Sequence, residues 1–504
     1  MTRSKESKST KAQGSSKEDV ELARDALFSA VEFEDDDSGV FPGTEHHSAS
    51  PRQFVRLFVS SNNTRSIKPG ISIREQKRIL LDAVGGFSKV HSRRFFGALD
   101  NIIQSVVEAG TYIPESAYQD NDGDCNGDQG VDVTPDPRSS EHLHFLNFAA
   151  LSLKAYVEGQ MKKQPTKKAP LVVVDEAFHV AERLHNVLFS LNSCGPDAVE
   201  PQSNIVAVCE CWWIANIEHR EMLILQALPL VVYATLGEDS STTKSSVRRL
   251  FLMKEAFAVV DFDDESAAPL KSLLFRVASS PMCLKTSEGK RFLAFLLQAD
   301  MTLLKGIYQA IRVQIPDAKT SILEAYGEIF FRAWKEAQEQ GVRDNIESEI
   351  LSDLIYAVIH VEKPRMVQSL LTILEPFHTA QKTPEVENLL YRMYGPILWR
   401  SLSAANYKVR INSAQVLAHV FPLQDSSHTQ TNQAIMKACG ALKSLTLDRD
   451  PEVRAAGSEA VAMVLSTYWD VIPSTEIRSL LNSKLIQFLL LCYLHCTFHL
   501  TVSP

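Results

Sequence analysis

The sequence predicts an all-α fold in which pairs of helices stack into an array. Apolar residues recur every three or four positions along most of the chain, the spacing of a helix that buries one face. Strand signals are nearly absent, because no Asn-Gly or Asp-Gly turn joins two segments of alternating polarity. One helical pattern also occurs twice near the carboxyl end. Together these observations indicate a repeat protein.

The composition agrees with a folded chain. Of the 504 residues 45% are apolar and 22% are charged, which is too apolar for a largely disordered protein. The formal net charge of −9 gives no overall attraction to nucleic acid or membrane, so any contact with phosphate must be local. The 8 cysteines include no CxxC pair, which indicates free thiols in a reducing compartment.

The amino-terminal part of the chain contains one predicted helical region between two polar segments. Residues 1–19 are mostly Ser, Lys and Glu and are expected to be a disordered tail. Residues 20–110 show helical periodicity and are expected to be a helical region. Residues 111–141 are acidic and rich in Gly and Pro, which predicts a flexible insertion.

The rest of the chain is expected to consist of helical repeats. Residues 142–345 show degenerate repeats, which a basic loop interrupts from Lys162 to Pro170, and residues 205–236 carry one uninterrupted helical pattern. Clearer repeats follow in residues 346–482.

The clearest repeat is the pair NYKVRINSAQVLAHVFPLQD (406–425) and DPEVRAAGSEAVAMVLSTYW (450–469). Val409 and Arg410 of the first copy match Val453 and Arg454 of the second, forty-four residues later. A helical-hairpin period of about 40 to 47 residues is typical of HEAT and armadillo units. One hairpin cannot bury both faces of its inner helix, so successive hairpins must stack.

The polar positions of the repeat have structural roles in this interpretation. Asn406 and Asp450 stand at the turns, where a short polar side chain accepts hydrogen bonds from the free N–H groups of the next helix. Arg410 and Arg454 lie one turn into that helix and can reach an acidic residue of the adjoining unit. We therefore interpret both arginines as stacking residues rather than as ligand-binding residues.

Two short segments resemble nucleotide- or metal-binding motifs without completing them. LVVVDEAF (171–178) is similar to the magnesium-binding strand of nucleotide hydrolases, but no glycine-rich phosphate loop is present, so Asp175 and Glu176 are interpreted as first-turn helix acids. DGDCNGD begins like a calcium loop at Asp122, yet its twelfth position is Val133 instead of Glu.

Other pairs of potential ligands and nucleophiles are equally incomplete. Cys209 with Cys211, and His142 with His144, lack a second pair at zinc-ligand spacing, so core packing is expected. No hydrolase, zinc-protease or kinase signature occurs in the sequence. The sequence therefore predicts no enzyme activity, no metal, no cofactor and no small-molecule substrate.

The strongest positive cluster consists of four lysines around a proline: Lys162, Lys163, Lys167 and Lys168. Such a loop could be bound by a nuclear import receptor, or its lysines could neutralise DNA phosphates. A loop that is merely solvated stays an equal alternative.

Beyond the period, particular strings resemble one family. EIFFRAWKEA (328–337), ENLLYRMYGPILWRSLSAANYKVRINSAQVLAHVFPLQD (387–425) and DRDPEVRAAGSEAVAMVLSTYWDVIP (448–473) are similar to the G-type HEAT subunits of condensin II. The resemblance implies an α-solenoid that acts as a regulatory scaffold without ATPase activity. It also implies a place in mitotic chromosome condensation and segregation, in the nucleus and on mitotic chromosomes.

The partners implied by this resemblance are the kleisin subunit, and through the complex the pair of SMC ATPases and the D-type HEAT subunit. Duplex DNA or chromatin is a further implied partner. The alternative is another HEAT or armadillo scaffold, of the nuclear-transport or phosphatase-regulatory type. Residues 485–504 depart from the family pattern and are apolar, but polar residues interrupt them, so no membrane anchor is expected. We interpret this tail as divergent, from alternative splicing or a mispredicted gene model that truncates the array.

Overall fold

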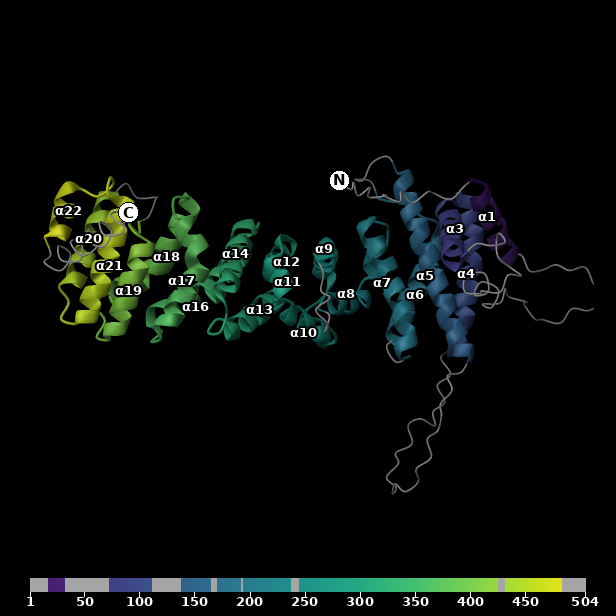
Figure 1. The fold of residues 1–504 in the computed structure, drawn as a ribbon, viewed down its shortest axis with the longest axis horizontal. Coiled ribbons are helices and arrows are strands. Elements are labelled where there is room, and N and C mark those ends of the chain that lie inside the picture. The colour runs from purple at the N-terminus through teal and green to yellow at the C-terminus, as the bar shows by residue number, and fades with distance from the viewer. Residues whose placement is uncertain are drawn as a thin grey trace, which may run out of the picture. The chain divides into compact units, whose positions relative to one another are not determined.

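The computed structural model describes residues 17–31, 72–110, 137–164, 170–191, 194–236, 244–424 and 431–482. Every regular element within these ranges is helical, which confirms the predicted all-α class (Figure 1). The chain divides into two compact units, Met1–Tyr233 and Ala234–Pro504, which are described separately. We call them unit 1 and unit 2.

Unit 1 is built from long helices that pack on their second neighbours in the chain. Its helices are α1 (Lys17–Val31), α3 (Ile73–Gly85), α4 (Lys89–Gly110), α5 (Pro137–Lys163), α6 (Asp175–Leu191) and α7 (Val199–Ile214), with short 3-10 turns η2 (Pro196–Ala198) and η3 (Arg220–Leu223); α8 (Ala227–Leu236) spans the boundary with unit 2. Helix α5 packs on α3 and α7, and α4 packs on α6. This alternation is the arrangement expected when successive helical hairpins stack.

An aromatic cluster fills the centre of unit 1. Phe95 and Phe96 of α4 are fully buried, with ring centroids 5.3 Å apart. Phe96 lies 5.0 Å from Tyr156 of α5, and Phe95 lies 6.5 Å from Phe148. Aromatic side chains bury large apolar areas, so this cluster holds α4 and α5 together.

Unit 2 continues the pattern with shorter helices, which follow one another in chain order (Figure 1). They are α9 (Lys244–Leu252), α10 (Ala268–Val277), α11 (Pro281–Lys285), α12 (Ser287–Ala299), α13 (Met301–Gln314), α14 (Thr320–Glu336), α15 (Gln340–Ile346), α16 (Ser352–His360), α17 (Pro364–Thr379), α18 (Pro384–Ser401), α19 (Tyr407–His419), α20 (Thr431–Thr446), α21 (Pro451–Tyr468) and α22 (Ser474–Leu481), with 3-10 turns η4 (Lys254–Val259) and η5 (Glu265–Ala267) and the π-turn η6 (Glu347–Leu351).

Stacking in unit 2 joins each hairpin to the next. Helix α14 packs on α12 and α17, while α19 packs on α16 and α21. The valines of the repeat lie inside this stack, with Val409 7% exposed and Val453 fully buried. Each hairpin therefore buries the apolar face of its neighbour, as the repeat period requires.

Several element boundaries differ from those expected from the sequence. Helix α1 begins at Lys17, inside the predicted tail, and α5 begins at Pro137, inside the predicted insertion. Helix α5 also runs through Lys163, so the predicted basic loop begins later than expected. Residues 485–504 lie outside the described residues. None of the described helices has the length and apolar character needed to cross a membrane.

The uninterrupted helix expected over residues 205–236 is wrong. Helix α7 ends at Ile214, and α8 begins only at Ala227. Asn216 and His219 between them adopt positive φ angles of 53° and 59°. The apolar pattern continues across this break because buried side chains of the turn, Ile217, Leu223 and Ile224, supply it. Periodicity alone cannot distinguish these residues from a helix face.

Candidate functional site

The repeated turns before α19 and α21 have the same capping geometry. The Asn406 side-chain oxygen accepts a hydrogen bond from the Lys408 N–H at 3.0 Å. Asp450 accepts from the N–H groups of Glu452 and Val453, at 2.9 and 3.4 Å. These are the N-cap interactions predicted from the sequence, and they fix where the two inner helices begin.

Arg410 is the central side chain of the first junction, and it is only 4% exposed. Its Nη1 donates to the carbonyls of Ala404 and Ala405 at 2.8 and 3.0 Å, within its own turn. Its Nε and Nη2 donate to the two carboxylate oxygens of Asp448 at 2.9 and 2.8 Å, in the next hairpin. The guanidinium therefore joins two successive hairpins through a bidentate ion pair.

Arg454 repeats half of this arrangement. Its Nη1 donates to the carbonyls of Asp448 and Arg449 at 2.9 and 3.1 Å, which are the positions equivalent to Ala404 and Ala405. The side chain of Arg454 is half-buried. Both arginines thus hold the turn that precedes their own helix, and Arg410 additionally binds the adjoining unit.

The Asp448 carboxylate is held in its ionised form. Hydrogen bonds from Arg410 are the largest cause that lowers its pKa, and the N–H of Asp450 also donates to it at 2.9 Å. Because Arg410 and Asp448 satisfy each other, neither is free to bind a ligand. This supports the structural interpretation of Arg410.

A groove of about 710 Å³ opens beside this junction, between the end of α18 and helix α20. Trp399 of α18 and Leu402 directly after that helix, with Ala441 and Leu445 from α20, provide apolar lining. Exposed Lys437 and Arg449 add positive charge, and the Lys437 ammonium lies 4.0 Å from the centroid of the Trp399 ring. An apolar floor with a cationic rim suits an extended peptide that carries apolar and acidic side chains.

Reasoning from the sequence did not identify Trp399 and Lys437 as a site. Trp399 occurs in PILWR, a string that carries the family resemblance, but its chemistry is ordinary for a helix end. Lys437 lies in another helix, and only the packing of α20 brings it over the indole ring. No spacing rule within one helix could have indicated this pair.

The structure describes only part of the predicted lysine cluster. Lys162 and Lys163 form the exposed last turn of α5, where their positive charges complement the helix dipole. Lys163 also donates to the carbonyl of Phe87 at 3.3 Å. Lys167 and Lys168 lie outside the described residues, so the four-lysine cluster stays a prediction.

The remaining motifs agree with the structural interpretation. Asp175 and Glu176 form the first turn of α6, as predicted. Cys209 is buried in α7, and burial raises the pKa of its thiol to about 12, so it is an unreactive core residue. His142 and His144 lie on α5 and are in no group of three or more potential metal ligands among the described side chains. The segment from Asp122 to Val133 lies outside the described residues.

A comparison with known families matches a region that covers one wall of the groove. Residues 276–425 match the family described as the condensin II non structural maintenance of chromosomes subunit. The match runs from the end of α10 to just past α19, and so includes Trp399 and Arg410. The resemblance to the condensin II family is confirmed.

Curated condensin II proteins are similar to a larger part of the chain. The human condensin-2 complex subunit G2 is 32% identical over 285 residues, which are 56% of this chain and 25% of that protein. The mouse subunit G2 is 31% identical over 58% of this chain and 25% of its own, and the zebrafish (Danio rerio) subunit G2 is 31% identical over 60% and 26%. The chain thus spans about a quarter of the length of these condensin II relatives.

An engineered protein of known structure also aligns with 89% of this chain and 98% of its own length. The sequence identity is 14% and the TM-score 0.32, so this alignment carries no argument.

Proposed function

We propose that this chain is a regulatory HEAT-repeat scaffold subunit of condensin II that binds the kleisin subunit of that complex. The observation that carries the proposal is the condensin II family match over residues 276–425, which includes the hairpin that forms one wall of the groove. The curated relatives are named as subunits of the condensin-2 complex, which supports the same assignment.

The groove gives this proposal a binding mode. An extended kleisin segment would place apolar side chains against Trp399 and Leu402 and acidic side chains toward Lys437 and Arg449. Asp448 does not repel such a segment strongly, because Arg410 neutralises its carboxylate. Trp399 is the expected hot spot, since aromatic anchors carry much of the binding energy at protein interfaces.

Binding the kleisin would connect this chain to the SMC ATPase pair and to the D-type HEAT subunit. In this role the chain contributes shape and contacts to chromosome condensation and segregation in mitosis, while the ATPases perform the chemistry. It would act in the nucleus and on mitotic chromosomes, and cationic side chains would assist the engagement of duplex DNA. No residue of the chain is required to perform covalent chemistry.

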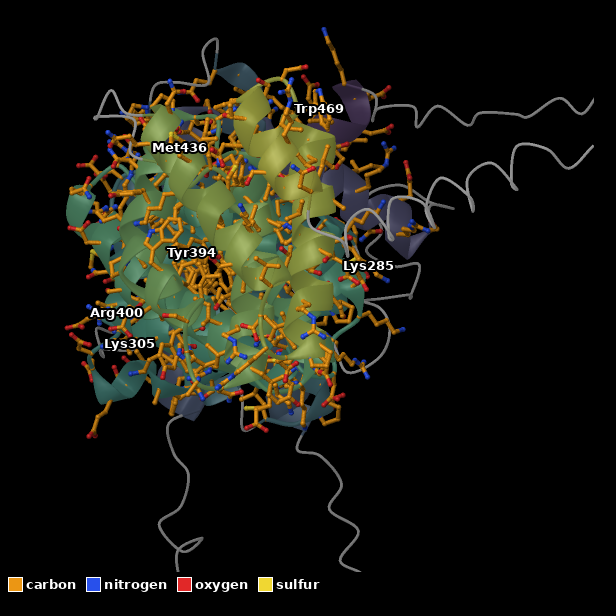
Figure 2. All side chains as sticks on the ribbon, turned by 90° about the vertical axis from the view of Figure 1, so that its left-hand side faces the viewer. Lys285, Lys305, Tyr394, Arg400, Met436 and Trp469 are labelled. Carbon is orange, nitrogen blue, oxygen red and sulfur yellow. The ribbon has the colours of Figure 1, made fainter. Side chains whose placement is uncertain are left out.

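Co-purification of the full chain with the condensin II kleisin tests the proposal. The double variant Trp399→Ala/Lys437→Glu should lose at least tenfold in affinity for the kleisin, because it removes the apolar anchor and reverses a rim charge. Trp469→Ala/Lys285→Glu is the matched control, since Trp469 is 52% exposed and Lys285 is also exposed. Figure 2 shows the control residues Trp469 and Lys285 on the opposite side of the view from Arg400 and Met436.

The outcomes separate the two scaffold classes. Recovery of the kleisin by wild type and by the control variant, with loss in the groove variant, supports the proposal. Equal recovery of the kleisin by all three proteins would show that the groove is not the binding site. Recovery of import cargo or a phosphatase, without any kleisin, would replace condensin II with the alternative HEAT or armadillo scaffold.

A further inference from the structure

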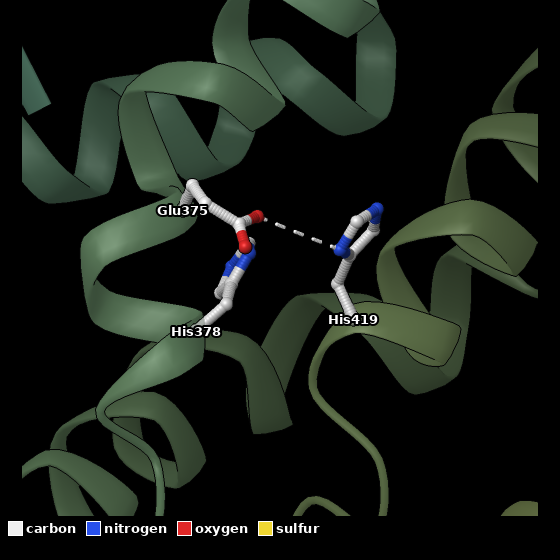
Figure 3. A group of neighbouring side chains, drawn as sticks. All are labelled: Glu375, His378 and His419. Carbon is white, nitrogen blue, oxygen red and sulfur yellow. Dashed lines mark ion pairs between the residues drawn. The ribbon is translucent and has the colours of Figure 1, made fainter. Parts of the chain in front are cut away.

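Three side chains with metal-binding donor atoms meet between α17 and α19. Glu375 and His378 lie one turn apart on α17, and His419 ends α19 (Figure 3). One donor atom from each residue lies within 4.8 Å of the donor atoms of the other two. The Oε2 atom of Glu375 and the Nδ1 atom of His419 are 3.9 Å apart.

His378 provides the second observation, a buried polar atom without a partner. The residue is 4% exposed, and its Nε2 atom lies 3.0 Å from the hydroxyl of fully buried Tyr394. Its Nδ1 atom is buried and makes no hydrogen bond in the described structure. When the ring carries its proton on Nε2, that N–H donates to Tyr394 and Nδ1 presents an unused lone pair. Leaving such an atom unsatisfied is unfavourable, and coordination of a metal would satisfy it.

The surrounding hydroxyl groups hold the non-ligating atoms of the cluster. The Thr379 hydroxyl donates to Oε1 of Glu375 at 3.1 Å, which leaves Oε2 for a ligand. The Tyr394 hydroxyl accepts from the Nε2–H of His378, which leaves Nδ1 for a ligand. Hydrogen bonds from outer groups to the far side of each ligand are a recurring feature of protein metal sites.

The neutral form of an imidazole coordinates metals, and burial of these two rings favours that form. Burial lowers the pKa of His378 to about 3, and the neighbouring His419 contributes to this shift. Burial also lowers the pKa of His419, although the Glu375 carboxylate opposes that effect.

We propose that Glu375, His378 and His419 bind one divalent transition metal ion of the zinc type between α17 and α19. Metal–nitrogen and metal–oxygen bonds of roughly 2.1 Å in a tetrahedral site place donor atoms about 3.4 Å apart. The Glu375 side chain is 56% exposed, so a rotation of its carboxylate can bring Oε2 closer to the imidazole nitrogens without moving a buried side chain. Water, or a side chain of a binding partner, completes the fourth position.

The ion would connect successive hairpins, since α17 ends one hairpin and α19 ends the next. The ion pair between Arg410 and Asp448 makes the equivalent connection at the following junction. A metal ion that binds the folded state but not the unfolded chain would stabilise the folded state, by an amount that grows with the logarithm of the free metal concentration above the Kd. The inference is independent of the proposed partner, because it rests on three side chains outside the groove.

Zinc affinity of the full chain, measured by competition with a chromophoric chelator, tests the proposal. The wild type is expected to bind one ion tightly, and His419→Gln and Glu375→Gln are each expected to weaken binding at least tenfold. His360→Gln is the matched control, because it removes an imidazole that stacks on Tyr356 outside the cluster, and it should leave the affinity unchanged. Added zinc should raise the thermal midpoint of the wild type but not that of His419→Gln.

Cobalt substitution supplies a spectroscopic measurement of the same site. The wild type and His360→Gln should give the visible absorption of tetrahedral cobalt, and His419→Gln should lose it. Zinc affinity that is equal in the wild type and both ligand variants would overturn the proposal.

Circular dichroism shows whether each ligand variant retains its helices. If a ligand variant loses its helices, Thr379→Val tests the metal site instead. This substitution removes only the exposed hydroxyl that donates to Glu375. A roughly tenfold loss of affinity in Thr379→Val supports the site, and an unchanged affinity overturns it.

Discussion

The guanidinium of Arg410 and the carboxylate of Asp448 form a two-point ion pair between residues that are 38 positions apart in the chain. Arg410 belongs to α19, and Asp448 lies in the turn before α21. The arginine side chain is 5% exposed and the carboxylate 15% exposed, so solvent screens this pair less than an ion pair at the open surface. The contact fixes how one hairpin sits on the next.

Removing this guanidinium should destabilise unit 2 strongly. Arg410→Met removes both guanidinium donors from the Asp448 carboxylate, which keeps the Asp450 N–H, and leaves two turn carbonyls without the guanidinium. The expected cost is about 3 kcal/mol in the free energy of unfolding. Arg454→Met is the matched control at the equivalent repeat position. It should lower the free energy of unfolding by only about 1 kcal/mol, because the Arg454 side chain donates to two carbonyls and forms no bidentate ion pair with a described residue. Denaturant unfolding curves compare the two variants, and equal losses would contradict the role of the ion pair.

The same pair predicts a contribution to stability that depends on pH. The pKa of Asp448 is lowered in the folded state, chiefly by hydrogen bonds from Arg410. This stabilisation is therefore fully present above the ordinary carboxyl pKa of 3.8 and is lost as pH falls through the lowered folded-state pKa. The stability difference between wild type and Asp448→Asn should shrink as the pH falls from about 5 to about 2. Asp317→Asn, which changes an exposed carboxylate, is the control. A constant difference would count against the prediction.

The close approach of α14 and α17 depends on a glycine. A Cβ atom at Gly327 would lie 2.5 Å from the backbone oxygen of Ile373, and backbone cannot move aside as a flexible side chain can. Gly327→Ala should therefore destabilise the protein by about 1 to 3 kcal/mol, although alanine favours helix formation.

Gly440 of α20 provides the control, because nothing lies within 4 Å of a Cβ atom there. Gly440→Ala should stabilise the protein by about 1 kcal/mol. Thermal unfolding of the two variants in parallel measures both effects. The same sign for both substitutions would show that the packing of α14 on α17 is not the constraint.

The predicted lysine cluster can be tested by its effect on DNA binding. Lys162→Glu/Lys163→Glu should weaken binding to duplexes of any sequence and reduce its salt dependence. Each phosphate contact that is lost means that about one counterion fewer is released from the DNA on binding. Substituting Lys167 and Lys168 as well should extend the loss. Lys17→Glu/Lys89→Glu makes the same change of charge at exposed lysines of unit 1 and is the control. An electrophoretic shift that is unchanged in the quadruple variant would remove the cluster from DNA binding.

Local physical chemistry was readable from the sequence alone. The helical period of Val409 and Val453, the caps at Asn406 and Asp450, and the first-turn acids of α6 each depend on residues within one or two turns. The helical period predicted the all-α class, and the need to bury the apolar faces predicted that the hairpins stack. The strings around PILWR were particular enough to indicate a resemblance to the condensin II family. Element ends were less certain, because apolar residues continue across turns such as Ala215 to Gln226.

Only the tertiary structure decided which distant residues meet. The sequence indicated that Arg410 could reach an acid in the next unit, but the packing of α19 on α21 selected Asp448. Helix packing also placed Lys437 over Trp399 and brought His419 to Glu375 and His378. The physical reason is that a period fixes which face of each helix is buried, while the shapes of the buried side chains set how far one hairpin shifts along the next. A site formed between hairpins depends on that shift.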